Sequence, residues 1–155
     1  MAYLNQIEFG RFGFKALGRH VKIGDKACIY NADQMEIGDY SRIGDFCIIS
    51  GRVKIGLFNH IIPMCLMAEG APGIIFKDFC NSEYGVKIFP PSDDYSGETV
   101  TNSLIPNRYT KELFAAVHLQ KRVIVVAETT ILPGVAVRVG CSVGAMSVLT
   151  KSTAA

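Results

Sequence analysis

A six-residue period runs through most of this chain and limits what it can fold into. From Val117 to Lys151, an aliphatic residue recurs at every sixth position. These anchors are Leu119, Val125, Ile131, Val137, Val143 and Leu149. The residue two places before each anchor is small or aliphatic, so both positions would lie on one face of a short strand. A period of six fits neither an α-helix nor a β-hairpin and is typical of a parallel β-helix, in which each hexapeptide forms one side of a triangular prism.

The same period governs the N-terminal part of the chain. Its anchors are Leu17, Ile23, Ile29, Ile37, Ile43, Ile49, Ile55, Ile61, Met67, Phe76, Ser82 and Ile88. Glycine follows several of these anchors, as at Gly38 and Gly44, where a tight corner would need either a positive φ or a close backbone approach. Aspartate often comes next, and its side chain can bond the backbone of a turn. Twelve anchors here and six after residue 116, at three per turn, predict an all-β solenoid of about six coils.

Two segments of the chain do not follow the repeat. Residues 1–16 carry three phenylalanines at irregular spacing, and we expect them to cap the open end of the core. Residues 17–155 are expected to form the β-helix domain. Within it, from about residue 89 to 116, the period disappears in a stretch rich in Pro, Ser, Asp and Asn. A structureless insertion this long in a compact domain usually carries function.

The composition excludes several classes of protein. With 155 residues, of which 49% are hydrophobic and 19% charged, the chain can form one soluble domain with a buried core. A formal net charge of +2 without a cluster of basic residues argues against nucleic acid as a partner. The N-terminus has no signal sequence, and no apolar run approaches the ~20 residues of a bilayer span. We therefore expect a cytoplasmic protein without membrane insertion.

Four of the five cysteines fall on the inward, small-residue position of the repeat. These are Cys47, Cys65, Cys80 and Cys141. We interpret them as reduced packing residues, because the chain contains no C-x-x-C pair and such cysteines behave as small apolar side chains. Cys28 lies beside an inward position and should point outward.

Several motifs follow one another along the chain in a specific order. They are GFKALG at 13–18 with IYN at 29–31, IGD at 37–39 with SG at 50–51, NHI at 59–61, SDDYSGE at 92–98 and ILPGV at 131–135. In this order they resemble the hexapeptide-repeat acyltransferases, above all the sugar O-acetyltransferases of the galactoside acetyltransferase type found with bacterial surface-polysaccharide enzymes. The resemblance covers essentially the whole chain. It implies a left-handed β-helix, acetyl-CoA as co-substrate, no metal, and a homotrimer with active sites in the clefts between neighbouring prisms.

Transfer of an acetyl group to a sugar hydroxyl requires a base, and two histidines fit that role. An imidazole with a pKa of ~6.5 suits it, and general-base catalysis typically gains about 10²- to 10⁴-fold. His60 lies between the inward positions of Asn59 and Ile61, so its side chain should project outward. It also occupies the histidine position of the family's NHI motif, and we predict that it is the general base. His118 projects outward directly after the long loop and is the rival base.

The SDDYSGE motif of the long loop supplies candidates for substrate binding. The residues predicted to contact the sugar are Ser92, Tyr95, Ser96 and Glu98, together with Asn59. In galactoside acetyltransferases the catalytic histidine comes from the equivalent loop, whereas this loop contains none. Asp93 or Asp94 is instead predicted to orient His60, within the chain or across a subunit interface, by accepting the second N–H of its ring.

The C-terminal coils are expected to hold the acyl donor. By resemblance, the wall that binds acetyl-CoA contains Ala127, Gly144, Ala145, Thr150 and Lys151. Arg138 would add a contact to a phosphate. An exposed backbone N–H on this wall would stabilise the thioester oxyanion, a donor worth about 2.7–4 kcal/mol in kcat.

The residues and the resemblance together predict an acetyl-CoA-dependent sugar O-acetyltransferase of surface-polysaccharide biosynthesis. Two other functions stay open. N-acylation of a nucleotide-linked amino sugar would use the same base and donor but would need a nucleotide site. A non-catalytic scaffold would keep the prism and fill the cleft with side chains. The γ-class carbonic anhydrases share the prism, but their zinc needs three histidines with a close H-x-x-x-x-H pair, which this sequence lacks.

Overall fold

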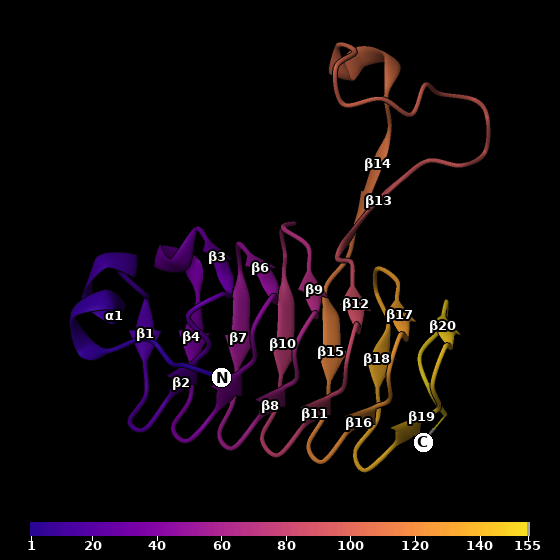
Figure 1. Ribbon diagram of the computed structural model, residues 1–155. Helices are drawn as coiled ribbons and strands as arrows, with labels where there is room; N and C mark the ends of the chain where they lie inside the picture. Colours follow the sequence, from indigo (N-terminus) through magenta and orange to yellow (C-terminus); the bar gives the residue numbers. More distant parts are fainter. Residues whose placement is uncertain (155) are drawn as a thin grey trace.

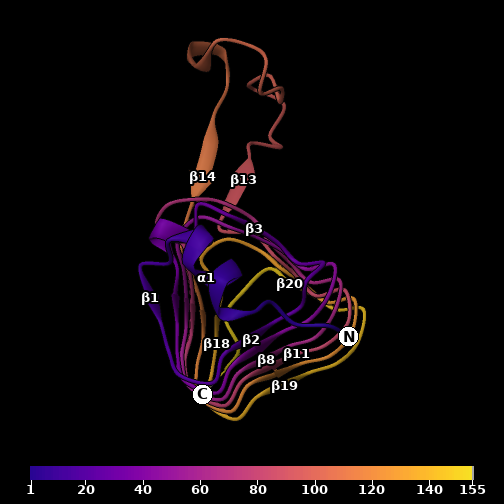
Figure 2. The same ribbon diagram turned by 60° about the vertical axis from the view of Figure 1, so that its left-hand side comes forward.

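The computed structural model describes residues 1–154, which form a triangular prism of short parallel strands (Figures 1 and 2). Three six-stranded sheets make its faces. Face 1 consists of β1 (Ala16–Leu17), β4 (Glu36–Ile37), β7 (Val53–Ile55), β10 (Ile74–Phe76), β15 (Val117–Leu119) and β18 (Ala136–Val137). Face 2 consists of β2 (Lys22–Ile23), β5 (Arg42–Ile43), β8 (His60–Ile61), β11 (Asn81–Ser82), β16 (Ile124–Val125) and β19 (Ser142–Val143). Face 3 consists of β3 (Cys28–Tyr30), β6 (Ile48–Ser50), β9 (Leu66–Met67), β12 (Lys87–Ile88), β17 (Thr130–Ile131) and β20 (Val148–Leu149).

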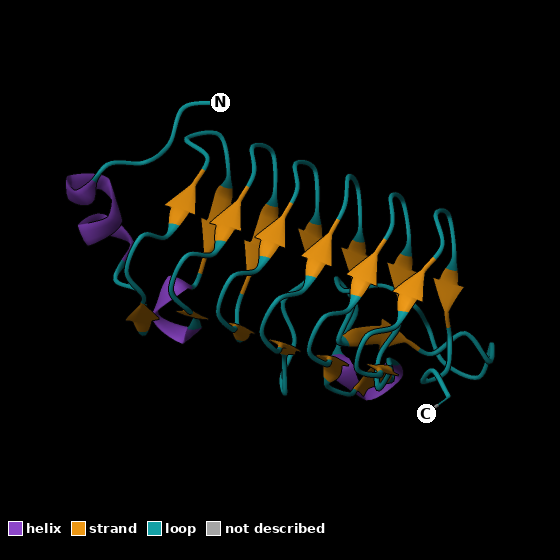
Figure 3. Ribbon diagram, turned by 90° about the horizontal axis from the view of Figure 1, so that it is seen from below, coloured by secondary structure: helices purple, strands orange, loops and turns teal. Residues whose placement is uncertain are grey.

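Every anchor predicted from the six-residue period lies in one of these strands. The parallel register places each anchor against the anchor three hexads further on, as in the pairs Ile43 with Ile61 and Ile49 with Met67. Nearly all of them are buried, and Leu17 at the open end of the prism is the main exception. Each coil therefore contributes one strand to each face, and the same strand recurs coil after coil (Figure 3). The predicted solenoid is confirmed.

Three of the four cysteines predicted to point inward are fully buried. Cys47, Cys65 and Cys80 are at most 2% exposed, whereas Cys141 in the last coil is only partly buried, Cys28 is exposed, and all five thiols are free. The buried thiols donate to backbone carbonyls at the corners of the next coil, as Cys47 Sγ does to Ile62 O at 3.3 Å. These thiols thus fill the core and also bond carbonyls of the turns.

The glycine that directly follows an anchor serves close approach and not a positive φ, as Gly38 shows. A Cβ on Gly38 would lie 2.5 Å from the carbonyl oxygen of Gly56 in the next coil. The positive φ falls two residues later, on Tyr40, at 60°. Asp39 between them accepts a hydrogen bond from the backbone N–H of Arg19 at 2.9 Å. The predicted aspartate thus bonds a turn of the preceding coil and ties two corners together.

An α-helix that the repeat did not predict covers the N-terminal end of the prism. α1 (Gln6–Phe12) begins with a capping box, in which the Asn5 side chain accepts from the N–H of Glu8 while the Glu8 carboxylate accepts from the N–H of Asn5. Phe9 of this helix joins the hydrophobic core. No helix within residues 1–154 is long and apolar enough to cross a membrane.

The long insertion leaves the prism between β12 and β15, at the edge where face 3 meets face 1. Its two sides pair as an antiparallel hairpin of β13 (Pro91–Asp93) and β14 (Glu112–Phe114). A 3₁₀ turn at Asn107–Tyr109 lies near its tip, and a second such turn, Ala32–Gln34, lies in the first coils. The hairpin projects far from the prism, on the side opposite to face 2 (Figure 2).

The polar anchor Ser82 should be a weak point of the core. It is 1% exposed between Ile61 and Val125, and its hydroxyl has no hydrogen-bond partner among the described residues. We expect Ser82→Ala to raise the free energy of unfolding by about 1 kcal/mol, because an unsatisfied buried polar group costs roughly 1–3 kcal/mol. The matched control is Ser41→Ala, which should lower it, since the Ser41 hydroxyl donates to Gly56 O and accepts from Asn59 N. Urea unfolding measures both, and a loss of stability in Ser82→Ala would contradict the prediction.

Candidate active site

His60 lies in the middle of face 2 with its side chain outward and half-buried. On its two sides in the parallel sheet stand Arg42 of β5 and Asn81 of β11. Burial lowers the pKa of His60 below its ordinary value of 6.5, and the nearby positive charge of Arg42 lowers that pKa further. A neutral imidazole is the form that can accept a proton, so the site favours a base.

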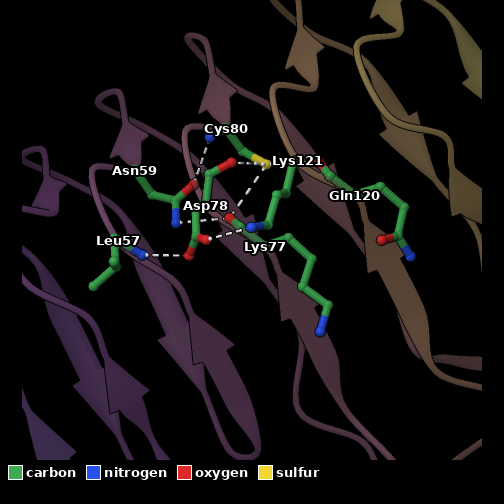
Figure 4. Close-up of polar contacts among 7 residues, drawn as sticks. All are labelled: Leu57, Asn59, Lys77, Asp78, Cys80, Gln120 and Lys121. Atoms are coloured by element: carbon green, nitrogen blue, oxygen red, sulfur yellow. Dashed lines mark hydrogen bonds and ion pairs between the residues drawn. The ribbon is translucent and has the colours of Figure 1, made fainter.

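Asn59 fixes the strand from which His60 projects (Figure 4). Its side chain is 2% exposed and belongs to the interior. The amide Nδ2 donates to Lys77 O at 3.0 Å, and Oδ1 accepts from Cys80 N at 2.7 Å. Both ends of the amide are therefore bonded to the next coil and turned away from the surface. This geometry corrects the assignment of Asn59 to substrate binding and makes it a brace for the His60 strand.

The corner beside Asn59 is held by a second set of polar contacts. Asp78 accepts a hydrogen bond from Leu57 N at 3.0 Å and forms an ion pair with Lys121 at 3.2 Å (Figure 4). The hydrogen bond from Leu57, followed by the ion pair with Lys121, lowers the pKa of the Asp78 carboxyl. Three successive coils are linked in this way at the edge nearest to His60, which makes the backbone under the candidate base rigid.

Asn81 is a candidate site residue that the sequence reasoning missed. It occupies the same outward position as His60, one coil further along. Its Oδ1 atom is buried and has no hydrogen-bond partner among the described residues. Buried polar atoms are usually paired, so this unpaired amide oxygen distinguishes Asn81 from the other outward residues of face 2. The register of the repeat could have identified it. Asn81 precedes the anchor Ser82 as His60 precedes the anchor Ile61, and the two residues pair directly in the sheet.

Face 2 runs between two ridges of exposed apolar side chains at its edges. The ridge towards face 1 is a stack of His20, Tyr40, Phe58 and Phe79, whose successive ring centroids are 4.7, 5.0 and 5.5 Å apart. The ridge towards face 3 carries Phe46, Met64, Tyr84 and Met146, each at least half exposed. His60 thus lies in a shallow strip with apolar walls. Such contiguous exposed apolar surface is typical of an interface or a ligand site.

Five of the six predicted loop residues separate into two groups, and the exposed Glu98 belongs to neither. Asp94 accepts hydrogen bonds from Ser96 N and Ser96 Oγ, both at 3.0 Å, and from Thr99 Oγ1 at 3.1 Å. The hydrogen bonds from Ser96 are the main reason that the pKa of Asp94 lies below its ordinary value. Asp94 and Ser96 therefore shape the loop. The second group lines a groove of about 480 Å³ at the base of the hairpin, formed by Phe89, Pro91, Ser92, Asp93, Tyr95, Glu112 and Leu132.

Within a single chain, the hairpin and His60 are not close to each other. The hairpin leaves the prism at the edge opposite to face 2, so Asp93 and His60 lie on different sides of the molecule (Figure 2). His118 is also half-buried and outward, but on face 1, between Ile75 and Ala136. The two candidate bases therefore stand on different faces and do not form one cluster.

The predicted CoA residues are distributed over three edges of the last coils. Ala127, Gly144 and Ala145 lie at the corner between faces 2 and 3, where Met146 N donates to Ala127 O at 2.9 Å. Arg138 follows β18 at the corner between faces 1 and 2, and Thr150 and Lys151 follow β20. Only the first three residues form one continuous surface. Within residues 1–154, no group of three or more His, Cys, Asp and Glu side chains is arranged to hold a metal ion.

Comparisons with known proteins give close matches over nearly the whole chain. A dTDP-4-amino-4,6-dideoxy-D-glucose acyltransferase of Escherichia coli is 35% identical over 153 residues, which cover 96% of this chain and 79% of the relative. The structure of AntD, an N-acyltransferase from Bacillus cereus in complex with dTDP and 3-hydroxybutyryl-CoA, is 38% identical, with a TM-score of 0.94 over 97% of this chain and 80% of AntD. No family model matches the chain.

A more distant structure agrees in fold alone. The polySia-specific acetyltransferase NeuO has a TM-score of 0.62 at 17% identity, over 85% of this chain and 60% of NeuO. The left-handed β-helix that the motif order implied is confirmed by these matches. The O-acetyltransferase specificity that the motifs favoured has no counterpart in the two close relatives, whose names specify an acyltransferase of a dTDP-linked amino sugar and an N-acyltransferase.

The protonation of His60 should reflect its surroundings. We expect its ring to titrate below pH 6.5 in the folded protein, and Arg42→Gln to raise this pKa only in part, because burial remains the larger cause. Between the folded and unfolded pKa values the unfolded chain binds more protons, so this histidine lowers stability as the pH falls below 6.5. NMR of ¹³C-labelled histidine measures the titration, with His60→Gln to assign the signal. An unchanged pKa in Arg42→Gln would remove Arg42 as a cause.

Proposed function

This chain belongs to the hexapeptide-repeat acyltransferases of the left-handed β-helix fold, and from this premise we propose that it transfers an acyl group from acyl-CoA to the amino group of a dTDP-linked amino sugar. The observation that carries the proposal is the 35% identity, across 96% of the chain, to the Escherichia coli enzyme named for dTDP-4-amino-4,6-dideoxy-D-glucose. N-acylation is thereby preferred over the O-acetylation that the sequence motifs favoured.

We propose that His60 is the base of this reaction. An amino group is protonated at neutral pH and becomes a nucleophile only after it releases one proton to the solvent. The neutral amine nitrogen attacks the thioester carbonyl, the C–S bond breaks, and an amide forms while CoA leaves. His60 takes the second proton from the attacking nitrogen and returns it to the departing thiolate, so the imidazole ends neutral. Burial and the charge of Arg42 both favour this neutral starting form.

The acidic groove at the base of the hairpin also suits an amine better than a hydroxyl. Asp93 and Glu112 face each other across the hairpin, since they pair in its antiparallel register. Together with Ser92 and Tyr95 they line the groove. Two carboxylates attract an ammonium group, whereas a neutral hydroxyl gains only a hydrogen bond from them. We propose that this groove guides the amino sugar towards the base.

The groove and His60 can act on one substrate only if two copies of the chain combine. They lie on opposite sides of a single prism (Figure 2). The two apolar ridges beside His60 provide surface for a neighbouring subunit. We therefore propose a homotrimer in which the hairpin of one subunit reaches face 2 of the next.

We propose that the acyl-CoA lies along the last coils, at the corner between faces 2 and 3. Ala127, Gly144 and Ala145 expose backbone there without bulky side chains, so a pantetheine arm can approach the amide groups. A backbone N–H at this corner would bond the thioester oxygen as charge develops on it. Other corners of the same coils carry Arg138, Thr150 and Lys151. These residues would contact the phosphates of a CoA molecule bound to a neighbouring subunit.

The acceptor class and the base can be tested in one assay. With dTDP-4-amino-4,6-dideoxyglucose and acetyl-CoA or 3-hydroxybutyryl-CoA, the protein should release CoA and form a product that resists mild alkali, because an amide survives where an ester hydrolyses. His60→Gln should lower kcat by about 10²- to 10⁴-fold, the usual range for a lost general base. His118→Gln is the matched variant, and a comparable loss there alone would transfer the role to His118. No turnover with any acyl donor would favour a scaffold.

A shared site predicts complementation between inactive subunits. We expect Asp93→Asn and His60→Gln each to have low activity alone, and mixed oligomers of the two to regain part of it. Some clefts then combine an intact His60 from one subunit with an intact Asp93 from the other. Two different affinity tags allow mixed oligomers to be isolated, and each variant carried through the same procedure alone is the control. Mixed oligomers without any gain would place the complete site within one chain.

A further inference from the structure

The first residues of the chain form a short N-terminal strap, residues 1–4, along the free edge of face 2. Two backbone hydrogen bonds attach it to the end of β2, one donated by Leu4 N at 2.9 Å and one accepted by Ala2 O at 3.1 Å. Between these bonds, Tyr3 forms an antiparallel bridge with Gly24. The strands of face 2 are parallel to one another, so the strap is an addition to the repeat. Its backbone is bonded on both sides of Tyr3, which fixes where the Tyr3 side chain begins.

The ring of Tyr3 lies against two cations of face 2. Lys22 Nζ lies 5.5 Å and Arg42 Cζ lies 5.6 Å from the ring centre, at the distance of a cation–π contact. Neither cation forms an ion pair with a carboxylate among the described residues. The side chain of an arginine has many rotamers, and a contact with a fixed group selects among them. The Tyr3 ring is therefore the contact that can hold the Arg42 guanidinium in one place.

Arg42 connects the strap to the candidate base. It pairs with His60 in the register of face 2, and neighbouring strands lie about 4.8 Å apart. On the other side of His60 stands the uncharged Asn81. Burial is the main reason that the pKa of His60 is lowered, and the positive charge of Arg42 lowers that pKa further. The strength of this second effect depends on where the guanidinium is held, because a charge that turns to solvent is screened.

Other charged groups around His60 do not duplicate Arg42. Lys22 stands one strand further away in the same outward column. The charged side chains at the corners of the preceding and following coils are Asp39, Asp45, Lys77, Asp78 and Glu83. Two of these carboxylates, those of Asp39 and Asp78, are already in ion pairs. The position of Arg42 is therefore the electrostatic feature of the base that a contact with the strap can change.

The strap uses a backbone donor that a corner of the prism would otherwise use. Asp39, two places after its anchor, accepts a hydrogen bond from the matching N–H of the preceding coil, that of Arg19, at 2.9 Å. The matching donor for Asp45 is Asp25 N, but this N–H donates to Ala2 O instead. Asp45 Oδ1 is buried and has no partner among the described residues. The first coil thus loses a corner bond where the strap is attached, which favours a role for the strap beyond covering an edge.

We propose that Tyr3 is a positioning residue for the candidate base, and that its ring acts by holding the Arg42 guanidinium beside His60. The inference rests on the proposed function, in which His60 is the base. It extends the active site from the prism to the N-terminal strap. The strap fixes Tyr3, Tyr3 holds Arg42, and Arg42 favours the neutral form of His60.

The titration of the His60 ring, measured by NMR of ¹³C-labelled histidine, tests this chain of contacts without any substrate. We expect Tyr3→Leu to raise the pKa of His60, because a released Arg42 turns to solvent and its charge is screened. The rise should be smaller than in Arg42→Gln, where the charge itself is absent. Tyr3→Phe keeps the ring and should keep the wild-type titration. The matched control is Tyr30→Leu, which removes an exposed ring from face 3 and should change nothing.

The double variant Tyr3→Leu/Arg42→Gln shows whether Tyr3 acts through Arg42. Its His60 titration should equal that of Arg42→Gln alone. A further shift in the double variant, or no rise in Tyr3→Leu, would overturn the inference and leave the proposed function in place. The signal of His118, which lies on face 1, should be the same in all variants and reports an intact prism.

The pH dependence of kcat distinguishes the role of Tyr3 from the role of His60. If His60 is the base, kcat falls as the pH drops through the pKa of His60 in the enzyme–substrate complex. This fall should begin at a higher pH in Tyr3→Leu than in the wild-type protein and in Tyr3→Phe. A fall that stays at the same pH while the ring titration moves would remove His60 as the base, and with it the part of Tyr3 in the reaction.

Discussion

Hydrogen bonding between successive coils is the constraint on which this structure depends. It holds each strand about 4.8 Å from the next and stacks every side chain on the residue in the same position of the neighbouring coil. An inward column must therefore be apolar or must bond the backbone, as Asn59 does through both ends of its amide. In an outward column, the side chains of successive coils are held at this same fixed spacing. Arg42, His60 and Asn81 stand on one such column, with the candidate base between the other two.

This constraint also explains which parts of the structure could be predicted from the sequence. A repeating backbone imposes a repeating pattern, so the aliphatic anchors identified all eighteen strands of the prism. The helix α1 has no repeat to reveal it, although Asn5 and Glu8 form a recognisable capping box. Asn81 was missed because its meaning depends on its neighbour across the sheet, and a hexapeptide considered alone does not show that neighbour. The hairpin lies outside the parallel register of the prism, so the six-residue period could not predict its course.

In the aromatic ridge beside face 2, ring stacking offsets the backbone strain of the corner residues. Bulky residues such as Tyr40 and Phe58 adopt a positive φ at the corners, where glycine would be less strained. A left-handed conformation costs a residue with a side chain about 1–2 kcal/mol. Each stacked ring pair stabilises the fold by about 0.5–1.5 kcal/mol, and such pairs recur along the edge. The exposed stack thus stabilises its own corners, and it can be kept for local reasons as well as for binding.

The hairpin leaves the prism at an edge, where one face has ended and the next has not begun. An insertion there changes no register and displaces no anchor, because β12 and β15 keep the same places in their sheets whatever lies between them. The prism can therefore keep its strands and the candidate base in place whatever the inserted segment contains. Replacing residues 91–114 as one block is a way to change the groove at the hairpin base without altering the core.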